Sequence, residues 1–551
     1  MMLGIDVGGT HTDAISIEGG EITASAKRVT RKKDLVGSIV DAVSGLGIDV
    51  ARVKRVVLST TLATNSIVEN TLAPVGMVVS AGPGIDPREY FLNEDFYLVK
   101  GAIDHRGREY QGLSDRDVVD AGKKLRARSI EGIGIVSKFS VRNPIHENRM
   151  YYLLASEFKY ISMGHQMSGS LSFPRRLYTT YFNTAVMPLQ HGFLKSVGEA
   201  FRDMGINADI LILKADGGTI THDTAFRLPV ETILSGPAAS IMGAIALTGE
   251  RRTALVLDIG GTTTDIGVLV KGVPLMQPQG VDMAGKKTLV RGLDLLSLGL
   301  AGDSTVVVED GKIRIGPGRK GPPACLGGTS PTPTDALSVM GLFDKGERKR
   351  AEESFESIAQ VLDKGVEEVA RQVIKKFCQE LKSAVTEFIN GLNSRPVYTI
   401  HDMIYPELIS PETVIVVGGP AGSFCSLMED TFGIECKVPQ YHEVANAIGA
   451  CLARTTARIT LVADTHLGKL ICPELDIEKD IPGDYSPDDV KAFGMERLDE
   501  LYRYLGMEDK PDIDVVEEQS FNMVRGFRTV GKNIRLRMQT RPGVLSLSRA
   551  Q

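Results

Sequence analysis

One short pattern occurs twice in this chain, and the repeat restricts the folds that the sequence can adopt. "IDVGGTHTD" spans residues 5–13 and "LDIGGTTTD" spans residues 257–265. In each copy an apolar run enters a pair of glycines, threonines follow, and an aspartate stands on either side. Glycine permits a turn with positive φ and lets backbone N–H groups approach a ligand closely. We therefore expect a duplicated fold in which each half carries one glycine hairpin.

The two glycine turns are suited to phosphate oxygens, because backbone N–H groups and threonine hydroxyls converge on one concave turn. A single copy would fit a tight hairpin without a ligand, but the repeat favours phosphate binding. The residues that we expect to hold phosphates are Gly8, Gly9, Thr10 and Thr12 in the first copy and Gly260, Gly261, Thr262 and Thr263 in the second.

The aspartates that enter the two turns predict a cation. Asp6 and Asp258 stand at the ends of apolar strands, and their charge would repel a phosphate unless a cation lay between them. We expect Mg²⁺ there, bound partly through water; the alternative is that both carboxylates cap their turns through backbone N–H groups. The trailing aspartates, Asp13 and Asp265, either support the metal ligands or cap the return strands, and the sequence leaves both roles open.

A third glycine turn, "VVGGPAGS" at residues 416–423, follows a predicted strand and opens a predicted helix. The N-terminus of such a helix is placed to accept the adenosine or the α-phosphate edge of a nucleotide. We expect Gly418, Gly419 and Gly422 to face the adenosine.

The composition excludes several classes of function. The chain has 551 residues, 42% of them hydrophobic, and a formal net charge of -6, which gives no support for a nucleic-acid or polybasic membrane role. Apolar runs are broken well before ~20 residues, so we expect no transmembrane span, and the N-terminus lacks a signal-peptide pattern. The six cysteines include no Cys-x-x-Cys pair, which favours a reduced, cytoplasmic setting without a zinc or iron–sulfur site.

Alternating strand and helix patterns divide the chain into four predicted parts. The stretch "APVGMVVSAG" (73–82) is predicted to continue the first sheet, and helices are expected near 347–363 and 366–392, where one face is apolar. The parts are the beginning of an N-terminal α/β domain at 1–85, an insertion with the remainder of that domain at 86–250, a second domain at 251–456 and a small C-terminal domain at 457–551.

Three glycine turns in the order hairpin, hairpin, strand–helix resemble the signature of the actin-like, Hsp70-like and sugar-kinase-like ATPase superfamily. The resemblance implies an α/β fold with two actin-like (ribonuclease H-like) ATPase domains, together with the insertion and the small C-terminal domain. In that fold each domain contributes one hairpin, and the two hairpins grip the phosphates of ATP across a cleft.

Stretches between the turns resemble one family, the ATP-dependent hydantoinase/oxoprolinase family, which includes the N-methylhydantoinase A subunit and the acetone carboxylase β subunit. "LSTTLATNSIVE" (58–69) is similar to its "HGTTVATNALLE", and "NPIHE" (143–147) matches its "NPxHE". "IGPGRKGPPACLGGTSPTPTDALSVMG" (315–341) stands where the family has "VGPxSAGAxPGPACYGRGGxxPTVTDAN". Ordered motifs of this kind cover about residues 3–455, so the resemblance is specific.

The chain departs from the family pattern at several points. "GLAGDS" (299–304) replaces "GAGGGS" and introduces Asp303, while Leu58-Ser59 stands where the family has a histidine. "GGPAGSFC" replaces the family's "GGAGPLHA", and His11 replaces an aromatic residue. These departures leave the substrate open.

The resemblance implies an enzyme that uses ATP and Mg²⁺ to phosphorylate a carbonyl oxygen of a small substrate: a cyclic amide such as hydantoin or oxoproline, a ketone, or bicarbonate. A companion subunit similar to hydantoinase B would then hydrolyse or carboxylate the activated species, within a homo- or hetero-oligomer. Two other functions stay open: a metabolite kinase of the same superfamily, and a nucleotide-gated interaction module without catalysis.

Several polar residues are candidates for binding the acceptor substrate, each with a structural alternative. Thr60, Thr61 and Asn65 would lie near the cleft, or they form the cap and first turn of a helix. His146 and Glu147 would orient substrate, or they belong to a helix start, where Pro144 fits the first position. The pair Arg175 and Arg176 would bind an anionic substrate, or both side chains extend from a helix to solvent.

Overall fold

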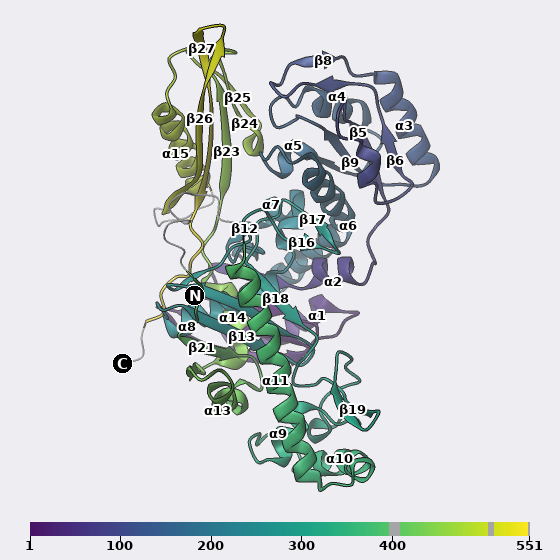
Figure 1. Ribbon diagram of the computed structural model, residues 1–551, viewed down its shortest axis with the longest axis vertical. Helices are drawn as coiled ribbons and strands as arrows, with labels where there is room; N and C mark the ends of the chain where they lie inside the picture. The colour runs from purple at the N-terminus through teal and green to yellow at the C-terminus, as the bar shows by residue number, and fades with distance from the viewer. Residues whose placement is uncertain (396–407, 505–511, 549–551) are drawn as a thin grey trace.

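The computed structural model describes residues 1–395, 408–504 and 512–548 (Figure 1). It contains two sheets that are built in the same way. In the first, the strands follow the order β12-β11-β4-β1-β2-β3, with β1, β2 and β3 antiparallel and β1, β4 and β11 parallel. Its strands are β1 (Met2–Val7), β2 (His11–Glu18), β3 (Glu21–Val29), β4 (Arg55–Thr60), β11 (Asp209–Leu213) and β12 (Thr219–Thr221).

The second sheet repeats this plan in the order β15-β14-β13-β21-β22, and an extra strand, β18, pairs with β14. Asp6 lies opposite Asp13 in the first hairpin, and Asp258 lies opposite Asp265 in the second. This shared register confirms the predicted duplication. The strands are β13 (Ala254–Ile259), β14 (Thr264–Val270), β15 (Val273–Pro274), β18 (Leu295–Leu298), β21 (Thr413–Val417) and β22 (Glu435–Lys437).

Two helices cross between the halves. Helix α8 (Ser235–Thr248) packs its apolar face on the second sheet, and α14 (Ala445–Leu452) packs on the first. The helices also touch each other, and a Cβ added to Gly243 would lie 2.1 Å from the carbonyl oxygen of Ala445. Small residues therefore set the distance between the two domains. Around the first sheet lie α1 (Leu35–Ser44), α2 (Leu62–Val68) and α7 (His222–Arg227).

The inserted unit has a parallel sheet of its own in the order β10-β9-β5-β6. Because β5 (Val75–Ser80) pairs with β6 and β9, the prediction that this stretch continues the first sheet is wrong, and the inserted unit begins before residue 86. The other elements are β6 (Phe96–Leu98), β7 (Ala102–Ile103), β8 (Glu109–Gln111), α3 (Asp115–Ala127), β9 (Gly132–Ser137), α4 (Ile145–Leu154), β10 (Tyr160–Met163), α5 (Gly164–Met167) and α6 (Phe173–Asp203).

The second domain carries a helical extension at the far end of the molecule from the inserted unit (Figure 1). The helices predicted near 347–363 and 366–392 are confirmed as α10 (Arg348–Leu362) and α11 (Val366–Asn393). The remaining elements are β16 (Asp282–Met283), β17 (Lys286–Lys287), β19 (Val306–Glu309), β20 (Lys312–Ile315), α9 (Pro333–Val339) and α13 (Ala421–Phe432).

The C-terminal unit is an antiparallel sheet in the order β25-β24-β23-β27-β26, packed against one helix. It stands beside the inserted unit at one end of the molecule (Figure 1). Across the described ranges, no helix combines the length and apolar character that a membrane crossing needs. The elements are β23 (Arg458–Asp464), β24 (Lys469–Cys472), β25 (Ile477–Asp480), α15 (Pro487–Tyr504), β26 (Ile513–Arg525) and β27 (Arg528–Thr540).

Candidate functional site

The two glycine turns close in the same way. The N–H of Gly8 donates to the carbonyl of His11, and the N–H of Gly260 donates to the carbonyl of Thr263, each at 3.0 Å. The glycines at these turns do not adopt the positive φ that the sequence predicts. Glycine is favoured for another reason: a Cβ on Gly8 or Gly260 would press to 3.0 Å on the carbonyl that closes the turn.

The leading aspartates of the two hairpins meet at the interface between the domains. Nδ2 of Asn446 lies 3.4 Å from Oδ2 of both Asp6 and Asp258. Ser240 donates to Asp258 at 2.5 Å and to Oδ1 of Asn446 at 3.0 Å. Asp6 is 5% exposed and Asp258 is 8% exposed. The duplicated strands therefore bring two buried carboxylates, one from each domain, to a single polar centre.

The trailing aspartates have different neighbours in the two hairpins. Asp13 accepts from Nζ of Lys27 at 2.9 Å, and the same ammonium donates to the carbonyl of Glu443 at 2.9 Å. Asp265 faces Ser297 across the β14–β18 pairing. Lys27 thus offsets one negative charge beside the first hairpin.

Burial and mutual repulsion make the four carboxyls weak acids. Burial, with a smaller contribution from Asp13 and Asp258, raises the pKa of Asp6 to about 7. Burial and the charge of Asp258 raise the pKa of Asp265 to about 7 as well. The pKa values of Asp13 and Asp258 are also raised, chiefly by burial. A bound cation would replace the protons that this cluster otherwise takes up.

The donor set is chemically compatible with Mg²⁺. Oδ1 of Asp6, Asp13 and Asp265 is buried without a hydrogen-bond partner. Within the part of the chain that the structure describes, no three acidic, histidine or cysteine side chains converge closely enough to hold a metal by themselves. Mg²⁺ commonly takes one or two carboxylates and completes its shell with water and phosphate oxygens, so one carboxylate from each hairpin suits it.

The threonines of the turns divide into two groups. Thr10, Thr262 and Thr263 are exposed or half-buried at the tips. Thr12 is fully buried, and its hydroxyl lies 2.9 Å from that of Thr30, which in turn donates to the carbonyl of Gly8. The hydroxyl of Thr12 therefore supports the first turn from below instead of facing the cleft.

The third glycine turn lies directly against the second hairpin. Gly418 has a φ of +101°, and a Cβ there would lie 2.4 Å from the carbonyl of Ile259 and 2.7 Å from Oδ1 of Asp258. His442 donates through Nδ1 to the carbonyl of Gly418 at 2.8 Å. Gly419 and Gly422 are exposed at the start of α13. The fold thus brings the glycines predicted for adenosine next to one of the metal candidates.

The predicted acceptor residues Thr60, Thr61 and Asn65 lie beside the first hairpin. The N–H of Thr61 donates to the carbonyl of Val7 at 3.3 Å, and Asn65 donates to the hydroxyl of Thr61 at 3.2 Å. The hydroxyl of Thr60 accepts from the N–H of Leu62 at 3.1 Å, which caps the start of α2. The segment therefore forms the start of α2 beside the first hairpin, and its role in binding the acceptor stays a prediction.

Glu147 and Arg176 lie instead in the core of the inserted unit, and both are fully buried. Glu147 accepts from the N–H groups of Ser137 and His165, at 2.6 and 2.8 Å, and from Nδ1 of His165. Arg176 donates to the carbonyls of Ser170, Ser137 and Lys138. Arg175 donates to Gln279 and to the carbonyl of Thr288. Apart from Nε of Arg176, which is buried without a hydrogen-bond partner, these polar groups bond within the protein.

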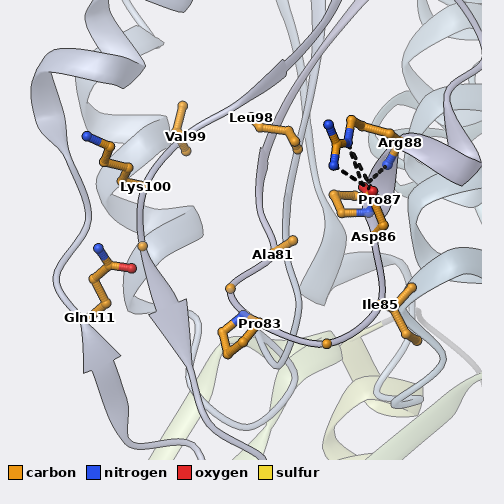
Figure 2. A pocket seen from close by; sticks show the side chains of 13 residues that line it. Ala81, Pro83, Ile85, Asp86, Pro87, Arg88, Leu98, Val99, Lys100 and Gln111 are labelled. Atoms are coloured by element: carbon orange, nitrogen blue, oxygen red, sulfur yellow. Dashed lines mark hydrogen bonds and ion pairs between the residues drawn. The ribbon is translucent and has the colours of Figure 1, made fainter.

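His146 is also buried in the inserted unit, where it bridges Ser80 and Glu109 at 3.2 and 2.9 Å. Next to it lies a pocket of about 470 Å³, lined by residues 81–88, 98–101 and 111. Figure 2 shows that Arg88 and Asp86 in this pocket pair with each other. None of the residues predicted for the site lines this pocket.

Sequence reasoning missed Asn446, Ser240, Lys27 and Arg319. Arg319 pairs with Asp303 beside the second hairpin. One available signal was Asn446 itself, a lone amide in a run of small and apolar residues ("ANAIGACLA"), where a buried polar group needs a partner. For the other three, the local pattern alone does not indicate which aspartate each contacts.

Comparison of the sequence with known proteins identifies the family models and relatives that this chain matches. Residues 2–158 match the model of the hydantoinase/oxoprolinase N-terminal region, and residues 176–459 match that of hydantoinase/oxoprolinase. The α subunit of caprolactamase from Pseudomonas jessenii is 24% identical over 62% of this chain and 55% of its own length. The γ subunit of acetophenone carboxylase from Aromatoleum aromaticum is 24% identical over 62% of this chain and 53% of its own length. The alignments thus span little more than half of these curated relatives.

Solved structures agree on the fold over nearly the entire chain. Nucleotide-free acetone carboxylase superposes with a TM-score of 0.71 at 18% identity, covering 98% of this chain and 87% of that one. The ATP-dependent caprolactamase of Pseudomonas jessenii also has a TM-score of 0.71 at 18% identity, covering 100% of this chain and 89% of that one. The predicted α/β class with two actin-like domains is confirmed.

Proposed function

Since this chain belongs to the hydantoinase/oxoprolinase family, we propose that it uses ATP to phosphorylate a carbonyl oxygen of a small substrate for a companion subunit. The observation that carries the proposal is the convergence of Asp6 and Asp258 on Asn446 beneath the two glycine turns. Relatives named as subunits of a caprolactamase and a carboxylase support a companion subunit similar to hydantoinase B.

In this proposal the two hairpins hold the phosphates of ATP. Backbone N–H groups of Gly8, Gly9, Gly260 and Gly261 would donate to the phosphate oxygens, with the hydroxyls of the exposed threonines beside them. The N-terminus of α13, with Gly418, Gly419 and Gly422, would face the adenosine. One hairpin comes from each domain, so nucleotide binding would draw the domains together.

Asp6 and Asp258, one from each domain, would hold Mg²⁺, and the amide of Asn446 lies between the two carboxylates, 3.4 Å from Oδ2 of each. Mg²⁺ supplies charge neutralisation for the β- and γ-phosphates. Asp265 would support this arrangement from the neighbouring strand, and Lys27 would hold Asp13 as its salt-bridge partner.

The chemistry explains why ATP would be needed. The nitrogen lone pair delocalises into an amide carbonyl, which makes the carbon a weak electrophile and the nitrogen a poor leaving group, so hydrolysis of an unreactive cyclic amide is slow. Transfer of the γ-phosphoryl group forms a bond to the carbonyl oxygen and breaks the phosphoanhydride, and ADP leaves with the electron pair. Water attacks the carbonyl carbon, the ring carbon–nitrogen bond breaks and the nitrogen leaves as an amine, which forms an acyl phosphate. A second water attacks the acyl carbon, the carbon–oxygen bond breaks and phosphate departs with the original carbonyl oxygen. Thr60, Thr61 and Asn65, beside the first hairpin, would orient the carbonyl for in-line transfer.

The test combines a substrate screen with an isotope label. The chain, with and without its companion subunit, is assayed for ADP and AMP release with cyclic amides, ketones and bicarbonate. The proposal predicts stimulated ADP release and, with oxygen-18 in the carbonyl of the effective amide, labelled inorganic phosphate. Unlabelled phosphate would overturn carbonyl phosphorylation. A stable phosphorylated product without a companion would indicate a metabolite kinase, and nucleotide binding without stimulated turnover would indicate an interaction module.

A further inference from the structure

The tips of the two hairpins differ in one respect. A Cβ on Gly9 would have no atom within 4 Å, so the tip of the first hairpin is open. A Cβ on Gly261 would lie 2.5 Å from Oδ2 of Asp303. The N–H of Gly302 donates to the carbonyl of Gly260 at 3.0 Å, and the N–H of Asp303 donates to that of Gly261 at 3.1 Å. A carboxylate is therefore fixed by its own backbone over the second phosphate turn.

An unpaired carboxylate in this position would repel a phosphate, but Arg319 neutralises it. Nε and Nη2 of Arg319 donate to Oδ2 of Asp303 at 3.1 and 2.9 Å. The side chain of Arg319 is 26% exposed and that of Asp303 is 15% exposed. The guanidinium thus lies beside the second turn with some of its surface open to solvent.

Arg319 also acts on the other hairpin. The pKa of His11, at the tip of the first turn, is lowered by burial and by the positive charges of Lys27 and Arg319. Hydrogen bonds therefore hold the guanidinium of Arg319 close to the second turn, and its positive charge also contributes to the lowered pKa of His11 in the first turn.

Both members of the pair depart from the family patterns given above. Asp303 stands where "GAGGGS" has a glycine, and Arg319 stands where "VGPxSAG" has a serine. The two departures lie in different loops and form one ion pair. A charge at either position alone would be unpaired beside a phosphate turn, which is a reason for the two to occur together.

We propose that Arg319 is a further catalytic residue, which Asp303 holds in the nucleotide-free state and which transfers to the terminal phosphate when ATP binds. This rests on the proposed function of the hairpins. The planar guanidinium fork matches phosphate oxygens as well as it matches a carboxylate. A cation at the γ-phosphate stabilises the charge that develops during phosphoryl transfer. Because ADP lacks that phosphate, Arg319 stays with Asp303 in the ADP complex.

The proposal predicts opposite effects for the two partners. Arg319→Gln lowers ATP turnover by about 100-fold or more, and it weakens a non-hydrolysable ATP analogue and the ADP–aluminium fluoride complex more than it weakens ADP, because the unpaired Asp303 repels every phosphate but only the terminal one also loses the guanidinium. Asp303→Asn frees the guanidinium and removes a negative charge, so the ATP analogue binds about fivefold more tightly, with little change for ADP. Calorimetric titration measures all three affinities.

The matched control is Arg314→Gln, which breaks an exposed arginine–glutamate pair with Glu309 in the same region. It leaves every affinity unchanged. The proposal is overturned if Arg319→Gln binds the ATP analogue and the fluoride complex as the wild type does, or if Asp303→Asn weakens the analogue as Arg319→Gln does, because a merely structural ion pair loses the same from either side. Wild-type protein that binds neither ATP nor ADP would instead refute the proposed function.

Discussion

Asp6 and Asp258 come from different domains and share a single amide, Nδ2 of Asn446, which lies 3.4 Å from Oδ2 of each. Asn446 stands at the start of α14, the helix that crosses from the second domain to the first sheet. A change in the angle between the domains would therefore part the two carboxylates. This arrangement couples domain closure to the geometry of the proposed metal site.

The cluster of buried carboxyls predicts a pH-dependent stability. The folded-state pKa of Asp6 is about 7, above its ordinary value of 3.8, so the folded protein holds an extra proton between these values. Stability then falls as pH rises through this window. Asp6→Asn keeps the neutral form, and we expect it to melt a few degrees above wild type at pH 8 without nucleotide or Mg²⁺.

The same comparison at pH 5 serves as the control, because that pH lies near the lower end of the window and the advantage of Asp6→Asn is smaller there than at pH 8. Asp203→Asn, at an exposed position, has no effect at either pH. Differential scanning fluorimetry measures both. An advantage that is equal at pH 5 and pH 8 would contradict the electrostatic explanation.

Gly418 and Gly419 form a matched pair for the third turn. In Gly418→Ala the new Cβ meets the carbonyl of Ile259 and Oδ1 of Asp258 at a φ of +101°, so we expect a loss of about 1–3 kcal/mol of unfolding free energy. Gly419 has no atom within 4 Å of an added Cβ, and Gly419→Ala keeps the wild-type melting temperature. Thermal denaturation measures both variants. Equal losses of stability in the two would show that the close backbone contact at Gly418 does not contribute to stability.

Much of the fold follows from local patterns. The hairpins are marked by their glycine turns. Long helices such as α10 and α11 are marked by apolar residues that recur with helical spacing and form one buried face. The sheet membership of β5 was mispredicted because a fully buried strand carries no alternation and nothing local selects its partners. Local sequence also does not indicate that α8 packs on the second sheet and α14 on the first, because this choice depends on long-range contacts.

Only the part of the candidate site that lies in the repeated sequence pattern could be predicted. The glycine turns and their aspartates stand out because the same letters occur twice. The partners of those aspartates come from remote segments: Asn446 for both leading residues and Ser240 for Asp258. Pairing of Asp303 with Arg319 could be suspected from two opposite charges at departures from the family pattern, but only the fold places them over Gly261.

His165, in the inserted unit, leads to a second prediction about the pH dependence of stability. Hydrogen bonds that His165 donates to Asp476 and Glu147 outweigh burial and raise the pKa of His165 to about 9, above its ordinary value of 6.5. The stabilisation is complete below pH 6.5 and is lost as pH rises through 9. His165→Gln leaves the buried Glu147 without its cation, so we expect it to cost about 3–5 kcal/mol at pH 6 and less at pH 10.

Urea denaturation at the two pH values measures the cost for His165. Asp476→Asn is the matched comparison: its carboxylate is 57% exposed, and its removal costs less than the removal of the histidine. A cost for His165→Gln that does not change between pH 6 and pH 10 would show that the charge of the imidazole plays no part.

The most direct test of the account is a calorimetric titration of the chain and of Asp258→Asn with ATP, in the presence of Mg²⁺ and of EDTA. We expect one Mg²⁺-dependent site per wild-type chain. In Asp258→Asn, which remains folded, affinity for Mg·ATP falls to the level seen with EDTA, and ATP turnover falls by about 100-fold or more. Asp203→Asn retains the wild-type values. ATP binding that is the same with EDTA and in Asp258→Asn, or turnover that survives the substitution, would contradict a Mg·ATP clamp built from the two hairpins.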